Sequence, residues 1–278
     1  MRDRFAKFVA TVALLIALAA PAAPQEKIPA EFTGLSEAQM EEVWEFVFGN
    51  ALFVLMHEAG HMLISEFELP VLGREEDAVD ALSTIIILES DSSVFDNALI
   101  DASDSWFLTG AAAGAAGADF AFWDEHSVEE QRAYAIVCMM IGHDAETFGG
   151  LDAVEDLPEE RRESCVWEYQ QTASSWFRLL EPHLRESGVS EVEIVYEEVS
   201  QPDLAVYAEA FRDAGMLELA KELAADAFLL EAGIRFQMAS CGEPNAFWDP
   251  QERLITYCYE LGQAHAELLA DYLRSEAR

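Results

Sequence analysis

The chain has 278 residues, of which 51% are apolar, so it can bury a large core in one elaborate domain or two small ones. Its 53 acidic residues outnumber its 16 basic ones and give a formal charge of −37. This charge disfavours nucleic acid and anionic membrane surfaces as partners, and we interpret it as a solvated acidic surface.

The N-terminal residues predict export. The basic residues Arg2, Arg4 and Lys7 precede an apolar run over residues 8–20, and Ala20-Pro21-Ala22 offers a small-x-small cleavage site. The run is too short to span a membrane comfortably. We therefore expect residues 1–23 to be a signal peptide. Residues 24–278 are expected to form a single domain, periplasmic or secreted, with no stable membrane insertion after cleavage.

A helical region with a capped start follows. Ser36-Glu37-Ala38-Gln39 has the pattern of a capping box and is expected to open a helix. Gly49-Asn50 is expected to bend or interrupt that helix before a second one, from Ala51 to about Phe67.

The second of these helices carries a metal-binding pattern. His57 and His61 lie one turn apart on the same helix face, and Glu58 lies beside them. Two imidazoles at this spacing can chelate one metal ion, and the glutamate can reach a water that the metal activates. This His-Glu-x-x-His arrangement is that of zinc peptidases.

Zinc peptidases need a third protein ligand, and the next expected helix, from about Arg74 to Leu88, supplies candidates. Glu76 is the expected ligand. Asp80, one turn later on the same face, would accept the second N–H of a ligating histidine and fix its tautomer. Glu75 points elsewhere on the helix and is the alternative ligand.

The middle of the chain is expected to be mainly helical. The expected helices cover residues 91–107 with a break near 103–105, 127–141 with a cap at Ser127, 158–185, 203–211, 216–230 and 261–275, with a loop at 142–157. The small-residue tract at 109–118 is either a closely packed helix or a mobile loop near the site, and composition leaves both open.

Strand patterns appear towards the C-terminus. Residues 191–199 and 234–239 are expected strands, and residues 245–248 and 253–259 flank Asp249-Pro250-Gln251-Glu252, a hairpin signal. The predicted fold class is α+β and mostly helical. It combines a metal-binding helix pair with one small antiparallel sheet or hairpin near the C-terminus.

The cysteines predict two disulfides in an oxidising compartment. None of the four has C-x-x-C spacing, which disfavours a cysteine-rich zinc site. A Cys138–Cys165 bond would join two helices. Cys241 and Cys258 would face each other across the hairpin, as a cross-strand disulfide.

His57 to His61 followed by Glu76-x-x-x-Asp80 resembles the gluzincins, whose ligands are two histidines on one helix and a glutamate on the next. Residues 69–78, 124–127 and 241–250 look like an exported bacterial family of putative metallopeptidases, otherwise a domain of unknown function. That resemblance covers most of the mature chain and implies a zincin-like helix pair.

Asn245-Ala246-Phe247-Trp248 is similar to the Asn-Ala-Phe-aromatic segment that thermolysin-like and neprilysin-like gluzincins carry on a substrate-binding sheet edge. By that similarity, Asn245 and the backbone of Ala246 would hold a peptide by strand addition. In those enzymes the edge strand precedes the His-Glu-x-x-His helix, whereas here it follows. A hairpin strand with core aromatics is the alternative interpretation.

These patterns predict an exported zinc metallopeptidase acting on a peptide or protein. His57, His61 and Glu76 would bind Zn²⁺, with Glu58 as general base. His126 is the expected oxyanion donor, and Tyr134 and Arg132 are weaker candidates. The alternatives are a catalytically inactive metal-binding scaffold and a zinc amidase acting on a non-protein amide.

Overall fold

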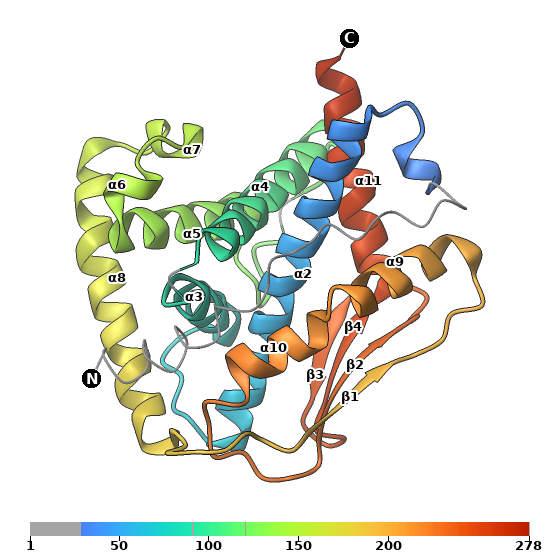
Figure 1. The fold of residues 1–278 in the computed structure, drawn as a ribbon. Coiled ribbons are helices and arrows are strands. Elements are labelled where there is room, and N and C mark those ends of the chain that lie inside the picture. The colour runs from blue at the N-terminus through green and yellow to red at the C-terminus, as the bar shows by residue number, and fades with distance from the viewer. Residues whose placement is uncertain (1–28, 91, 120, 278) are drawn as a thin grey trace.

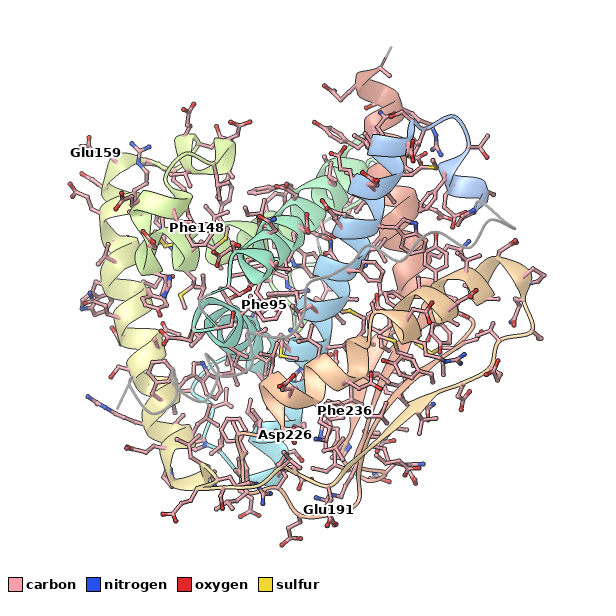
Figure 2. The ribbon with its side chains drawn as sticks, viewed as in Figure 1. Phe95, Phe148, Glu159, Glu191, Asp226 and Phe236 are labelled. Atoms are coloured by element: carbon pink, nitrogen blue, oxygen red, sulfur yellow. A yellow bond between two sulfur atoms is a disulfide. The ribbon has the colours of Figure 1, made fainter. Side chains whose placement is uncertain are left out.

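The computed structural model describes residues 29–90, 92–119 and 121–277. The expected signal peptide lies outside the described residues. As predicted, the described chain is mostly helical, with one small sheet near the C-terminus. Apolar side chains such as Phe95 and Phe236 are buried in the interior, whereas Glu159 and Glu191 are exposed (Figure 2).

Helix α2 (Glu37–Glu66) runs through the middle of the molecule (Figure 1). The predicted capping box is confirmed, because the Ser36 hydroxyl accepts a hydrogen bond from the backbone of Gln39 and the Gln39 side chain accepts one from the backbone of Ser36. The predicted interruption at Gly49-Asn50 is wrong, and the helix is continuous there. Asn50 donates from its side chain to the carbonyls of Phe46 and Asp101, so these residues pack α2 against α4 (Ser93–Ala116).

Helices cover one side of α2, and the sheet lies on the other (Figure 1). Next to α4, this helical side contains α3 (Glu75–Leu88), α5 (Glu129–His143), α6 (Ala145–Phe148), α7 (Asp152–Glu155) and α8 (Glu159–Leu180). The C-terminal helix α11 (Tyr259–Glu276) packs along α2 and α4. Two 3-10 turns are also present: Ala30–Phe32 packs against α11, and Glu181–His183 follows α8.

Several expected helix boundaries differ from the structure. Helix α4 has no break at 103–105 and includes most of the small-residue tract, whose residues 111–116 are largely solvent-exposed. Val128 rather than Ser127 is the N-cap of α5. The expected loop at 142–157 contains the two short helices α6 and α7.

The sheet contains β1 (Val192–Tyr196), β2 (Ile234–Ala239), β3 (Ala246–Asp249) and β4 (Leu254–Cys258), in the order β1-β2-β4-β3. The predicted hairpin of β3 and β4 is present and antiparallel. The sheet as a whole is mixed, because β1, β2 and β4 run parallel. Helices α9 (Pro202–Asp213) and α10 (Met216–Ala224) form the crossover that the parallel β1–β2 pair requires.

Both predicted cysteine pairs form disulfides. Cys138–Cys165 joins α5 to α8. The cross-strand placement of Cys241 opposite Cys258 is wrong, because the hairpin register puts Asn245 opposite Cys258, whose N–H donates to the Asn245 carbonyl. Cys241 instead lies in the loop that precedes β3.

By length and composition, α2 is the one helix within the described ranges that could cross a membrane. However, 83% of its apolar window is buried inside the fold. The apolar residues of α2 therefore form part of the core.

Gly60 lets α2 approach α3 closely. A Cβ atom at this position would lie 2.9 Å from both Cβ and Cγ1 of Val79. Gly60 directly precedes His61, and Val79 directly precedes Asp80, so this contact sets the distance between the two helix faces that carry the candidate ligands.

We expect Gly60→Ala to lower the free energy of unfolding by about 1–3 kcal/mol, because the added methyl group pushes α2 and α3 apart. Chemical denaturation measures this change. Gly114→Ala is the matched control, since Gly114 is helical and exposed, and a Cβ atom added there would have no neighbouring atom within 4 Å. That variant should gain up to about 1 kcal/mol. Equal stability of the two variants would contradict the close-packing account.

Candidate metal centre

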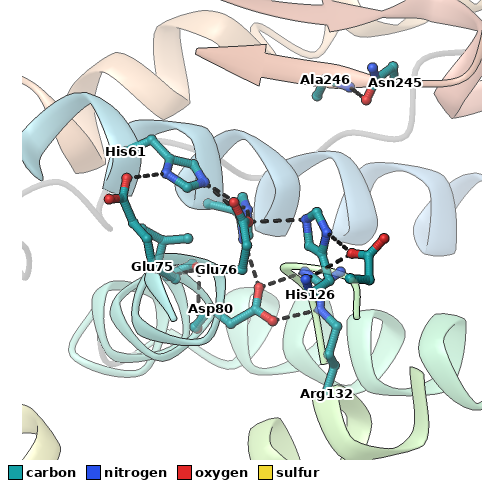
Figure 3. Close-up of polar contacts among 12 residues, drawn as sticks. His61, Glu75, Glu76, Asp80, His126, Arg132, Asn245 and Ala246 are labelled. Atoms are coloured by element: carbon teal, nitrogen blue, oxygen red, sulfur yellow. Dashed lines mark hydrogen bonds and ion pairs between the residues drawn. The ribbon is translucent and has the colours of Figure 1, made fainter. Parts of the chain in front are cut away.

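Three donor atoms from α2 and α3 converge beside the C-terminal half of α2 (Figure 3). Nε2 of His57 lies 3.0 Å from Oε2 of Glu76, and Nε2 of His61 lies 3.3 Å from the same oxygen. The two Nε2 atoms are 3.3 Å apart. Residues His57, His61 and Glu76 therefore form a group that could bind a metal ion.

These spacings fit a tetrahedral metal. Zinc bonds to nitrogen and carboxylate oxygen of about 2.0–2.2 Å correspond to ligand–ligand separations of about 3.3–3.6 Å in a tetrahedron. The observed separations of 3.0–3.3 Å approach this range, so a small outward movement of the side chains would accommodate the ion. Two imidazoles and one carboxylate are also a donor set that zinc accepts.

Each histidine has a carboxylate at its other ring nitrogen. Oδ1 of Asp80 lies 2.7 Å from Nδ1 of His57, and Oε1 of Glu75 lies 2.8 Å from Nδ1 of His61. The two glutamates on α3 thus have different positions. Glu76 reaches the nitrogens that face each other, whereas Glu75 reaches the outer nitrogen of His61 and is about half-exposed.

Asp80 is bound in turn by Arg132 from α5. The guanidinium donates from Nε to Oδ2 at 2.7 Å and from Nη2 to Oδ1 at 2.8 Å. It also stacks over the Trp106 ring, 3.7 Å from the centroid. Arg132 therefore binds the Asp80 carboxylate that contacts His57, and not a reacting oxygen. Tyr134, the other weaker candidate for oxyanion donor, packs edge-on against Phe107. Sequence reasoning missed this role of Arg132, because 52 residues separate the ion-pair partners.

Burial and opposite charges shift the pKa values in this cluster. Burial acts to lower the pKa of His57, but hydrogen bonds with Asp80 and Glu76 outweigh it and raise the value to about 9. Burial raises the pKa of Glu58, although the neighbouring histidines oppose this. Asp80 and Glu76 are desolvated too, yet their histidine partners hold both carboxyl pKa values below the usual range.

Glu58 meets the edge strand β3. Its buried carboxylate lies beside the Trp248 backbone, which acts to lower the carboxyl pKa against the effect of burial. Strand β3 packs against α2, so the C-terminal hairpin folds back beside the helix with the candidate ligands (Figure 1). A strand that follows this helix by nearly the whole chain is thereby placed next to it.

Strand β3 lies at the edge of the sheet, with one side free of strand pairing. The N–H and C=O groups of successive residues in a strand point to alternate sides. Asn245 is bonded to Cys258 on the β4 side, so the backbone groups of Ala246 and Trp248 point towards the free edge. The Asn245 side-chain oxygen accepts from the Ala246 N–H at 2.9 Å (Figure 3).

His126 reaches the cluster from the loop before α5. Its Nε2 lies 3.1 Å from Oε2 of Glu76, and its Nδ1 lies 3.0 Å from Oδ1 of Asp124. Arg74 holds this loop by donating to the His126 carbonyl at 3.1 Å. Asp124 was not predicted as the partner of His126. A carboxylate two residues before a histidine is a local pattern from which this contact could have been predicted.

Comparison with protein families identifies the family of this chain. A family model described as "Putative metallopeptidase" matches residues 21–180 and 196–277. No curated protein and no solved structure matches the chain. The family match spans most of the sequence, including both candidate ligand helices and the edge strand. The chain therefore belongs to this metallopeptidase family.

Proposed function

We propose that this protein is an exported zinc-dependent metallopeptidase of the gluzincin type. The observation that carries the proposal is the convergence of His57, His61 and Glu76, with Glu58 and a free sheet edge beside them. His57 Nε2, His61 Nε2 and a Glu76 oxygen would hold the ion. Asp80 would fix the His57 tautomer so that its Nε2 is free to ligate.

Zinc, when bound, supplies Lewis-acid polarisation of the scissile carbonyl and lowers the pKa of a coordinated water. Glu58 would take the proton from the attacking water and deliver it to the leaving amine. The Trp248 backbone beside Glu58 would help to hold its carboxylate for both transfers. His126, oriented by Asp124, would donate from Nε2 to the oxygen that becomes negative in the transition state.

The edge strand supports a peptide as substrate. An extended chain can add to the free side of β3, where the carbonyls of Ala246 and Trp248 point outward. The Asn245 amide offers a donor and an acceptor at the start of this edge. This backbone edge favours a peptide over a non-protein amide, because such an amide has no strand to pair with it.

The disulfides support the export proposal. Cys138–Cys165 and Cys241–Cys258 account for all four cysteines of the chain. Disulfides of this kind persist in oxidising compartments. Together with the signal sequence expected over residues 1–23, they are consistent with a periplasmic or secreted protein.

We expect Glu76→Ala to abolish stable zinc binding, and Glu75→Ala to reduce zinc affinity by no more than about tenfold. The reason is that only Glu76 faces the Nε2 atoms of both histidines. Zinc content after dialysis, measured by mass spectrometry, separates the two variants. Zinc that survives Glu76→Ala but not Glu75→Ala would overturn the choice of third ligand.

We expect Glu58→Gln to retain zinc and to lower peptide hydrolysis by roughly a thousandfold, because glutamine cannot accept the proton. Steady-state assays on a peptide library check this result. Glu41→Gln, an exposed substitution near the start of the same helix, is the matched control and should hydrolyse at the wild-type rate. A fully active Glu58→Gln variant would rule out this mechanism. Retained zinc without any cleavage by the wild type would favour the scaffold alternative.

A further inference from the structure

The edge strand β3 is anchored at its N-terminal end to the rest of the C-terminal region. The Glu260 carboxylate accepts hydrogen bonds from the backbone N–H groups of Cys241, at 3.1 Å, and Gly242, at 2.8 Å. The Cys241–Cys258 disulfide ties the same loop to the end of β4. These contacts fix the start of β3 within the sheet, but they do not fix the sheet against α2.

A second anchor lies at the other end of the hairpin and does reach α2. Arg253, in the turn between β3 and β4, donates from Nε to Oε1 of Glu66 at 2.8 Å and from Nη2 to Oε2 at 2.5 Å. Glu66 is the last residue of α2. Both side chains are largely shielded from solvent, with exposures of 26% for Arg253 and 13% for Glu66, so this paired geometry is stronger than an ordinary surface ion pair.

Arg253 also joins neighbouring segments. Its Nη1 donates to the Ala232 carbonyl at 2.7 Å, and its own carbonyl accepts from the Arg235 N–H at 3.0 Å. Its φ of 50° lies in the left-handed region, where glycine is the less costly residue. A long side chain at such a position indicates that the contacts of the guanidinium offset the backbone cost.

The two partners lie on the elements that must be aligned at the site. Glu66 follows Glu58 by eight residues on α2, about 12 Å along the helix. Arg253 follows Trp248 by five residues on the hairpin. An ion pair between Glu66 and Arg253 therefore limits sliding of β3 along α2 and keeps Trp248 of β3 beside Glu58.

We propose that Arg253 and Glu66 are a positioning pair that aligns the substrate-binding edge of β3 with the metal-binding helix. Neither residue touches the reacting atoms. The role in substrate binding rests on the proposed peptidase function, whereas the alignment of β3 on α2 does not.

Arg253→Gln tests the pair in the zinc-loaded full-length protein. We expect unchanged zinc content, unchanged hydrogen exchange over residues 53–64, and at least about tenfold faster exchange over residues 245–249. KM for extended peptides should rise about threefold to tenfold with a smaller change in kcat. Glu66→Gln should give the same result, and the double variant should be no worse than either single variant.

Arg235→Gln is the matched control. Arg235 lies on β2 and pairs with Glu252 of the same turn at 3.8 Å, without reaching α2. This variant should behave like the wild type in both measurements. Arg253→Gln and Glu66→Gln variants that exchange and bind like Arg235→Gln would overturn the proposal. Simultaneous loss of zinc and of protection over residues 53–64 would also overturn it, because the pair would then be a general stability element.

If the wild type cleaves no peptide, the proposed peptidase function fails. The exchange comparison still decides whether Arg253 and Glu66 align β3 with α2, so the two failures are distinguishable.

Discussion

The Glu76 carboxylate, held between the imidazoles of His57 and His61, is the interaction on which the rest of the site depends. It joins α2 to α3 near Gly60, which permits a close approach of the two helices. Buried polar groups are costly unless they are paired. Here both ring nitrogens of His57 and of His61 have a carboxylate partner. Such a cluster on the otherwise apolar stretch 51–64 of α2 indicates function more than stability.

The positions of Asp80 and Arg132 behind His57 follow from the contact between His57 and Glu76. His57 can present Nε2 towards Glu76 only if Nδ1 has its own partner, which is Asp80. The buried Asp80 carboxylate in turn requires a cation, which Arg132 provides from α5. Helix α5, which has no candidate ligand of its own, thus orients the face of α2 that carries the candidate ligands.

The sequence predicts those parts of the structure that depend on local spacing. The one-turn separation of His57 and His61, the capping box at Ser36 and the hairpin turn are all local, and each has its expected conformation. The packing of distant helices and the pairing of distant strands were not predictable. Gly49 breaks helices in isolation, yet it lies within a continuous α2 because α4 packs closely against it. Likewise, the parallel pairing of β2 with β4 is not encoded in the pattern of either strand.

The position of the edge strand β3 beside α2 is another feature that local sequence patterns do not predict. Its order in the chain differs from that in the gluzincins it resembles, but substrate binding requires proximity in space and not a particular order. The fold places β3 against α2, with the Trp248 backbone beside Glu58. The order of a strand in the chain and its position in space are therefore separate properties.

Anomalous diffraction at the zinc absorption edge, from crystals of the zinc-loaded protein, tests the central claim most directly. The account predicts one peak between α2 and α3, within about 2.0–2.2 Å of His57 Nε2, His61 Nε2 and a Glu76 oxygen. The Asp80 carboxylate should remain on His57 Nδ1. The absence of a peak at this position, or a peak ligated by Glu75 in place of Glu76, would contradict it.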